Sequence, residues 1–357
     1  MRSVALAAVL LSASFASAQG EVDHAAIARH ALTETIRPGY ADLAAKSEVL
    51  QDKTEALCRA PSKAALQATK DAFAATVESW SRVEIFRFGP MNHEHRYERL
   101  FFWPDPRGIG LRQVRRALLT KDDAVTSPET LRKKSVALQG LPAFEFLLYG
   151  KGADALSAGD AGAFRCRFAV SIAANVADIA HAVKQDWREG APFTKDYLSP
   201  GPNDPLYRAP KDVTLELFKA FSGGIELVRD QKLGKPLGES AETARPRLAA
   251  FWRSGLTFPN MAGNVEAVRA LFAKSGFADI VASQSPGVED SVLFDLNHAI
   301  EVLGTMNMPI GEAVREPAPR GKLTALRIAL KSARDTASGL IASGAGLSFG
   351  FNAMDGD

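Results

Sequence analysis

The feature that most constrains the fold of this chain is an apolar stripe at helical spacing between positions 164 and 187. Its members recur every three or four residues: Phe164, Phe168, Ile172, Val176, Ile179, Val183 and Trp187. Residues at this spacing share one face of an α-helix, so the segment predicts a long helix with one buried face. A similar stripe runs through Leu323, Leu326, Leu330, Ala333, Ala337 and Ile341. No segment alternates apolar and polar residues for long enough to predict a sheet, and we expect an all-α fold.

Further helices are predicted along the chain by the same periodicity. They cover about 22–57 (bent near Pro38), 62–83, 128–149, 211–231, 244–254, 262–274 and 288–305. The segment 190–210 holds five prolines and two glycines, which predicts a non-helical crossover between two halves. Trp80 and Trp252 each precede an aromatic turn that contains glycine and proline. We therefore predict an internal duplication, with similar helical-bundle halves at 19–189 and 211–357 packed against each other.

The first 18 residues have the pattern of a cleavable signal peptide. A positive start at Arg2 is followed by the apolar segment 4–11 and by the small residues Ala16-Ser17-Ala18. The apolar segment is too short to span a bilayer, and we expect a mature chain without a transmembrane segment. The expected location is the periplasm.

The cysteines and the charge balance bound the chemistry further. The chain has two cysteines, Cys58 and Cys166. In an oxidising compartment such a pair predicts one disulfide, with two separate buried thiols as the alternative. The 43 Lys and Arg residues are interspersed with 41 Asp and Glu residues, for a net charge of +2. No basic cluster points to nucleic acid as a partner.

Glu145 stands in an almost wholly apolar segment, Gly140-Leu141-Pro142-Ala143-Phe144-Glu145-Phe146-Leu147-Leu148-Tyr149-Gly150. A carboxylate on an apolar helix face is costly unless it is paired, hydrogen-bonded or bound to a cation. Glu145 is therefore either a structural ion-pair partner or part of a binding site, and the sequence leaves both open.

Residues 84–112 form a long connection that is rich in aromatic and charged side chains, which is typical of an ordered functional loop. The candidate binding residues are Glu145 together with Glu98, Arg99, Trp103, Asp105 and Arg107. The alternative is that Arg99, Asp105 and Arg107 tie the loop to the bundle by salt bridges and capping.

Candidate metal ligands occur in both halves. In the loop, His93 and His95 lie near Glu98, although an exposed polar loop is the alternative. In the second half, His298 and Glu301 are three residues apart and would share one helix face, as metal ligands or as a solvated polar face. Together with Glu145 these residues are the predicted metal set. The chain has no HExxH, GxSxG, GxxxxGK[ST] or CxxCH motif.

Several motifs together resemble those of the imelysin family. They are Trp80, Phe88-Gly89-Pro90, Glu98-Arg99, Phe102-Trp103-Pro104-Asp105, Gly140 to Glu145, Trp252-Arg253, Phe258-Pro259-Asn260, Gly350-Phe351-Asn352 and Asp355-Gly356-Asp357. The segment Gly140 to Glu145 looks like the family's GxHxxE motif, with Pro142 at the histidine position. The resemblance implies a helical protein of two similar halves, exported to the periplasm or outer envelope and associated with bacterial iron uptake. It also implies a metallopeptidase label.

The residues at the position of the family motif bear on whether the chain can be a metallopeptidase. Proline has no donor or acceptor side chain, so Pro142 cannot replace an imidazole ligand. A zinc hydrolase needs about three protein ligands and a general base, which Glu145 alone does not supply. We expect a non-catalytic periplasmic binding component of metal acquisition. Its ligand, iron or another divalent metal, would lie in the cleft between the halves and pass to an envelope transport partner. The alternatives are a metallopeptidase of the imelysin type and an envelope scaffold protein.

Overall fold

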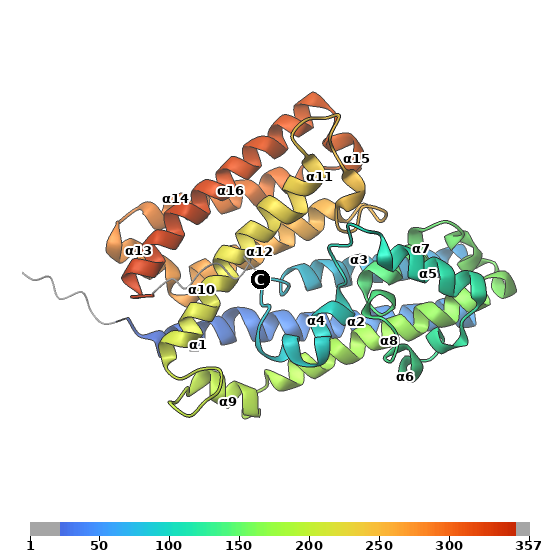
Figure 1. The fold of residues 1–357 in the computed structure, drawn as a ribbon, viewed down its shortest axis with the longest axis horizontal. Coiled ribbons are helices and arrows are strands. Elements are labelled where there is room, and N and C mark those ends of the chain that lie inside the picture. The colour runs from blue at the N-terminus through green and yellow to red at the C-terminus, as the bar shows by residue number, and fades with distance from the viewer. Residues whose placement is uncertain (1–21, 348–357) are drawn as a thin grey trace, which may run out of the picture.

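The computed structural model describes residues 22–347, and within this range every regular element is a helix (Figure 1). The all-α prediction is therefore confirmed. The predicted signal peptide and the motifs at 350–352 and 355–357 lie outside the described residues.

The first bundle is built on three long helices. Helix α2 (Arg37–Arg59) packs along both α3 (Lys63–Ser81) and α8 (Ala163–Asp186). The predicted stripe on α8 is buried from Phe168 to Trp187, while Phe164 is half-buried at its start. Shorter helices cover one side of this bundle: α4 (Arg96–Leu100), α5 (Ile109–Thr120), α6 (Pro128–Leu131) and α7 (Leu141–Tyr149).

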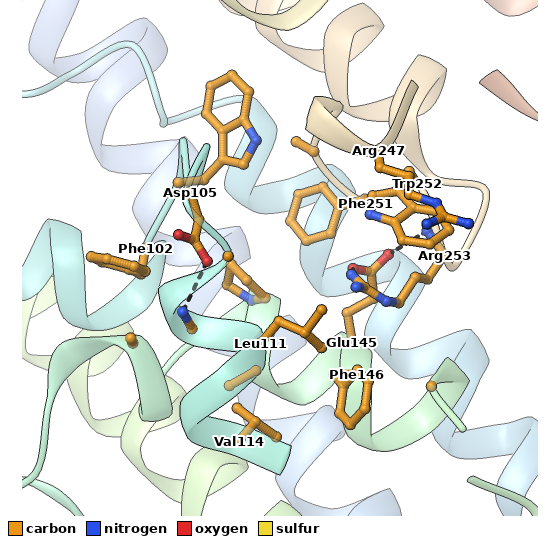
Figure 2. A pocket seen from close by; sticks show the side chains of 18 of the residues that line it. Phe102, Asp105, Leu111, Val114, Glu145, Phe146, Arg247, Phe251, Trp252 and Arg253 are labelled. Carbon is orange, nitrogen blue, oxygen red and sulfur yellow. Dashed lines mark hydrogen bonds and ion pairs between the residues drawn. The ribbon is translucent and has the colours of Figure 1, made fainter. Parts of the chain in front are cut away.

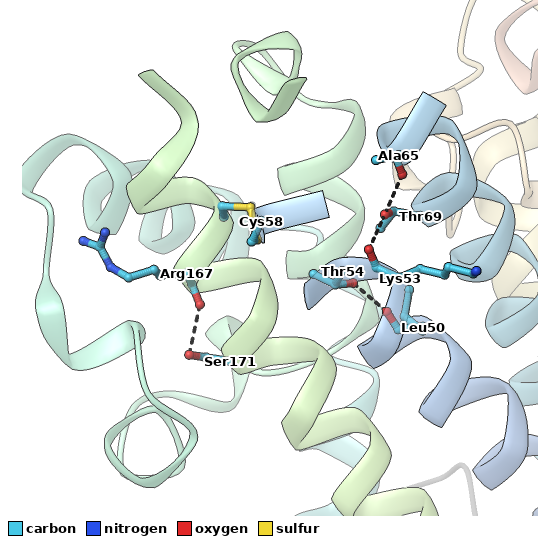
Figure 3. Close-up of a disulfide and its surroundings, with 9 residues drawn as sticks. Leu50, Lys53, Thr54, Cys58, Ala65, Thr69, Arg167 and Ser171 are labelled. Carbon is cyan, nitrogen blue, oxygen red and sulfur yellow. Dashed lines mark hydrogen bonds between the residues drawn. A yellow bond between two sulfur atoms is a disulfide. The ribbon is translucent and has the colours of Figure 1, made fainter. Parts of the chain in front are cut away.

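A disulfide joins the end of α2 to the start of α8. Cys58 and Cys166 are bonded, with their Cα atoms 5.6 Å apart (Figure 3). This confirms the predicted pair. The bond closes a loop of 108 residues, which contains α3 to α7.

The second bundle is formed by α10 (Pro210–Glu226), α12 (Thr257–Ser275), α14 (Val288–Gly304) and α16 (Pro317–Gly344). Three short helices complete it: α11 (Lys235–Leu237), α13 (Phe277–Gln284) and α15 (Ile310–Ala313). Helix α14 packs against both α12 and α16. The remaining elements are 3-10 segments: η2 (Gly89–His95), η3 (Asp123–Val125), η4 (Val136–Leu138), η5 (Ala153–Ser157), η6 (Gly159–Gly162) and η8 (Pro246–Leu248).

The two bundles meet along α3 and α12, and the first helix also crosses between them. Helix α1 (His24–Ala31) packs against α10 and α12 of the second bundle. Helices α3 and α12 approach closely at Gly263, where an added Cβ would lie 2.6 Å from the Cβ of Ser81. A side chain at this position would force the two bundles apart. Helix α1 thus contacts helices of the second bundle, and the domain bounds 19–189 and 211–357 stay a prediction.

Two π-helical segments precede prolines inside long helices. Segment η1 (Leu32–Ile36) lies just before Pro38, and η7 (Leu227–Gly234) lies just before Pro236. A proline inside a helix removes a hydrogen bond and crowds the preceding turn, and a π segment relieves both effects. The helix that was predicted to bend near Pro38 thus contains a π segment just before that proline, and the bend itself stays a prediction. The matching position in the second bundle agrees with the duplication, which stays a prediction.

Two predictions about prolines and glycines were wrong in detail. The crossover 190–210 is not free of helix, because α9 (Pro192–Leu198) starts at Pro192. Proline is favoured at a first helical position, where its missing N–H has no intrahelical partner to lose. The predicted helix 128–149 is divided into α6, η4 and α7, since Gly140 has extended backbone just before α7.

One described helix, α8, is long and apolar enough to cross a membrane by length and composition. Of its most apolar window, 67% is buried inside the fold, between the other helices of the first bundle. The helix is thus in the environment of a core helix.

Candidate functional site

A pocket with a volume of about 610 Å³ lies where the two bundles meet. One wall comes from the segment after α4, from α5 and from α7. The opposite wall is the turn at residues 247–253 of the second half (Figure 2). Aromatic rings supply much of the surface: Phe101, Trp103, Phe146, Tyr149, Phe251 and Trp252. A partly apolar pocket of this size between two bundles is the usual form of a small-molecule site.

Glu145 projects from α7 toward the 247–254 turn at this pocket (Figure 2). Its side chain is 3% exposed. The Oε1 atom accepts hydrogen bonds from the backbone N–H of Arg253 at 3.0 Å, the N–H of Ser254 at 2.9 Å and the Ser254 hydroxyl at 2.9 Å. The Oε2 atom lies 3.8 Å from Nη1 of Arg253.

Burial raises the pKa of Glu145 above its ordinary value, while the Ser254 donors and Arg253 act in the opposite direction. The structural partner left open by the sequence is present, whereas membership of a binding site stays a prediction. Glu145 is a structural acceptor that fixes a turn 108 positions later, and it also lines the pocket.

The residues before Glu145 explain the form of its segment. A Cβ on Gly140 would lie 2.2 Å from the carbonyl oxygen of Leu100, so only glycine fits where α7 begins. Pro142 is in the first turn of α7, where no intrahelical N–H is required. The glycine–proline pair therefore starts the helix against the 99–100 backbone, and Pro142 itself lines the pocket.

The turn that receives Glu145 was predicted to be the end of a helix at 244–254, and this was wrong. Only the 3-10 segment η8 is helical there, and Phe251 has a left-handed backbone with φ of +55°. Such a conformation is strained for a bulky residue and is found where surrounding contacts enforce it. The enforcing contacts are the Glu145 bonds and the bond from the Thr257 hydroxyl to Ala250 O at 2.7 Å.

A fully buried polar cluster lies behind the pocket and joins the two halves. Nζ of Lys232, on the π segment η7, lies 2.5 Å from Oε2 of Glu84 and 2.6 Å from Oδ1 of Asn260. Asn264 donates to the same Glu84 oxygen at 3.1 Å. The ammonium also lies 5.4 Å from the ring centroid of Phe101, which lines the pocket. The cluster therefore fixes the pocket wall from behind.

Cationic side chains gather at the pocket. Arg253 stacks on Trp252, with its guanidinium carbon 4.2 Å from the ring centroid. Arg247 approaches the same ring at 5.7 Å, and Arg115 approaches the Phe146 ring at 5.7 Å. Burial lowers the pKa of Arg253, Glu145 opposes this, and the nearby Arg115 and Arg247 lower it further. The three guanidiniums thus repel one another across the pocket.

Some residues that the sequence singled out do lie at this pocket. Trp103 lines it and donates its Nε1–H to Leu248 O at 3.1 Å, which links the two walls. Asp105 also lines it, but both of its oxygens cap α5 by accepting from the N–H groups of Ile109 at 2.7 Å and Gly110 at 2.9 Å.

Other predicted residues lie elsewhere. Arg99 donates to Gln139 at 3.0 Å and to Asn175 at 2.7 Å, so it ties the loop to α8. Glu98 and Arg107 are exposed and are not part of the pocket lining.

The predicted metal ligands are not brought together. His93 and His95 are exposed on η2, where Nδ1 of His95 lies 4.0 Å from Glu98. His298 and Glu301 share an exposed face of α14, and His298 stacks on Phe294. None of these four residues lines the pocket with Glu145. Across residues 22–347, no three His, Cys, Asp or Glu side chains are grouped so that they could hold a metal ion.

Four cations that line the pocket were not among the predicted site residues: Arg115, Lys151, Arg247 and Arg253. Arg253 carried a signal, because it follows Trp252 in a segment used for the family resemblance. Arg115 is followed by Arg116 and Arg247 lies two residues after Arg245, so both look like ordinary surface residues. Only the fold, which brings α5 and the 247–253 turn to the same pocket, places them together.

Comparison with known proteins places the chain. The family model for imelysin, a peptidase family designated M75, matches residues 36–337. The chain belongs to the imelysin family.

One curated relative is iron-regulated protein A of Synechococcus elongatus. It is 24% identical over 217 residues, which is 60% of this chain. The match spans 54% of that relative's length, so the chain corresponds to about half of it.

Two solved structures share the imelysin fold. An imelysin-like protein from Psychrobacter arcticum matches with a TM-score of 0.72 and 20% identity, covering 93% of this chain and 99% of that one. A putative iron-regulated protein A precursor from Parabacteroides distasonis matches with a TM-score of 0.74 and 12% identity, covering 90% and 94%. At these identities the likeness establishes the fold.

The residues at the pocket do not fit the catalytic metal that the peptidase designation of the imelysin family implies. Pro142 stands at the histidine position, and Oε1 of Glu145 is occupied by three donors from the 253–254 backbone and side chain. The other carboxylate, Asp105, caps α5. A hydrolytic zinc site requires about three ligands and an open position, which this arrangement does not supply.

Proposed function

We propose that this member of the imelysin family is a non-catalytic binding component of iron or other metal acquisition, and that its ligand lies in the pocket between the two halves. The observation that carries the proposal is the construction of the pocket. Its two walls come from different bundles, and they are held together by Glu145 and by the Trp103–Leu248 hydrogen bond. Its two carboxylates, Asp105 and Glu145, accept hydrogen bonds from backbone N–H groups and so hold the walls in place.

The names of two similar proteins support a role in iron acquisition. The Synechococcus protein and the Parabacteroides structure are both named iron-regulated protein A. The periplasm is supported by the signal-like pattern of residues 1–18 and by the precursor designation of the Parabacteroides protein. A handover to an envelope transport partner is part of the proposal.

The peptidase designation makes a metallopeptidase the second candidate, and one experiment separates the two. Calorimetric titrations with ferrous ion, ferric citrate and zinc would be run beside a peptide-cleavage assay with and without chelator. The variants are Trp252→Ala in the pocket wall and, as the surface control, His298→Ala/Glu301→Ala. We expect iron binding, as the ion or as a chelate, that the surface variant keeps and the Trp252 variant weakens.

Two results would contradict this function. Chelator-sensitive cleavage by the wild-type protein would favour the metallopeptidase. Absence of iron binding in every form would leave an envelope scaffold as the function to test.

A further inference from the structure

The charge of the pocket lining is unbalanced. Four cationic side chains line it, Arg115, Lys151, Arg247 and Arg253, against the two carboxylates of Asp105 and Glu145. The lining therefore carries an excess of two positive charges, four minus two.

Glu145 forms an ion pair with Arg253, but the hydrogen bonds that the two carboxylates accept come from backbone N–H groups and the Ser254 hydroxyl, not from the pocket cations. Both oxygens of Asp105 accept backbone N–H groups at the start of α5. Oε1 of Glu145 accepts three donors, and Oε2 is 3.8 Å from Arg253, beyond hydrogen-bonding distance. The guanidinium N–H groups of the pocket therefore keep most of their donor capacity.

The arginines at the mouth are held by aromatic rings. Within residues 22–347, Arg115 and Arg247 form no side-chain hydrogen bond or ion pair, and each is placed against a ring face, Phe146 for one and Trp252 for the other. Ring stacking orients a planar guanidinium and leaves its edge donors free. Such a guanidinium is prepared to bind an oxyanion with two parallel hydrogen bonds.

In a second pocket, of about 470 Å³ beside η1, the arginines are paired with carboxylate or amide acceptors. Its lining includes three carboxylates, Glu34, Asp42 and Glu266, against Arg82 and Arg269. There Arg82 pairs with Glu266 at 2.8 Å, and Arg269 donates to Asn297 at 2.8 Å. Of these two pockets, and within the described part of the chain, only the one between the bundles is lined by guanidiniums without a hydrogen-bond partner.

We propose that the pocket between the bundles binds a small molecule that carries two or more carboxylate or phosphate groups, held by Arg115, Arg247 and Arg253. The inference rests on the proposed binding function and names the class of its ligand. A bare metal cation would be repelled by the guanidiniums, whereas an oxyanion, alone or as the chelator of a metal ion, would neutralise them. The aromatic walls give the carbon skeleton of an organic anion a surface to pack on.

The test uses calorimetric titration of the full-length protein with citrate, pyrophosphate, ferric citrate and ferrous ion at low and at physiological salt. The pocket variant is Arg115→Gln/Arg247→Gln. The matched control is Arg116→Gln/Arg245→Gln, which removes the same two charges from exposed neighbours that do not line the pocket. Both variants act at exposed side chains, so both should fold, which circular dichroism would verify.

We expect at least one of the three oxyanion probes to bind the wild type. Its affinity should fall about tenfold or more in the pocket variant, since bonds to charged groups are strong, and should be unchanged in the control. Pyrophosphate without citrate binding would identify phosphate as the recognised group, and citrate without pyrophosphate binding would identify carboxylate.

Equal weakening in both variants, or binding of ferrous ion with no binding of any oxyanion probe, would overturn the inference. In the second case the proposed metal-binding function would stand. Binding of metal-free citrate or pyrophosphate with no binding of iron in any form would support the oxyanion site and overturn the iron function.

Discussion

Replacement of Glu145 tests the structural half of this account. In Glu145→Ala, the N–H groups of Arg253 and Ser254 and the Ser254 hydroxyl lose their shared acceptor. An unsatisfied buried donor costs about 1–3 kcal/mol, and loss of one partner of a buried charged pair costs about 3–5 kcal/mol. Because the three bonds converge on one oxygen, their costs overlap. We expect a total loss of about 3–5 kcal/mol in the free energy of unfolding.

Glu145→Gln separates the acceptor from the charge. The amide keeps an oxygen at the Oε1 position, so it can accept the same three bonds. Its NH₂ group would then face the Arg253 guanidinium, so the variant keeps the three hydrogen bonds but loses the ion pair. We expect a loss of about 1 kcal/mol, well below that of the alanine variant. The control is Glu98→Ala on the exposed side of the loop, which should change stability by less than about 0.5 kcal/mol.

Urea unfolding followed by circular dichroism and by tryptophan fluorescence measures these differences, with the disulfide kept oxidised. Two of the four tryptophans, Trp103 and Trp252, line the pocket, so part of the fluorescence change reports on the turn, while circular dichroism reports on the helices. A loss below about 1 kcal/mol for Glu145→Ala would refute the structural role, as would equal losses for the alanine and glutamine variants.

Three further predictions concern the surroundings of the pocket. Glu84→Gln should lower the free energy of unfolding by about 3–5 kcal/mol, because it leaves the Lys232 ammonium buried without its carboxylate partner. Adding Lys232→Met should recover part of this loss in a double-mutant cycle measured by urea unfolding, whereas additive losses would contradict the pairing. Burial lowers the pKa of Lys232 from 10.5 to about 8, so the folded state binds fewer protons than the unfolded state between these values. Relative to the uncharged double variant, the wild type should therefore gain stability as the pH rises from 8 to 10.5 in thermal unfolding scans, and a flat difference would count against the shift. Gly140→Ala should lower the free energy of unfolding by about 1–3 kcal/mol or more, because its Cβ would clash with the Leu100 carbonyl. The control Gly321→Ala, on an open face of α16, should leave stability unchanged or raise it, with both variants measured by chemical denaturation.

Periodicity predicted the helices well because burial of an apolar stripe is a local property of the sequence. Most of the α8 stripe is buried as predicted. The errors arose where backbone contacts from distant segments override propensity. The 244–254 segment reads as helical, but Glu145 captures two of its N–H groups from the other half and Phe251 takes a left-handed conformation.

The site was predictable only where a residue's chemistry was conspicuous. Glu145 and Trp103 stood out as a lone carboxylate in an apolar segment and as an aromatic residue in a charged loop. For His298 and Glu301 the spacing was right, but Leu296, Ala299 and Leu303 are the buried face of α14, and the histidine is on the opposite face. Arg115 and Arg247 carry no local signal, since their role depends on which surfaces the fold brings together.

The most direct test of the central claim is an anomalous-scattering experiment at the iron edge on crystals of the protein grown with ferric citrate. We expect an iron peak in the pocket between α5, α7 and the 247–253 turn, with citrate oxygens within hydrogen-bonding distance of Arg115, Arg247 or Arg253. A peak at His93 and His95 or at His298 and Glu301, with the pocket holding only solvent, would contradict it.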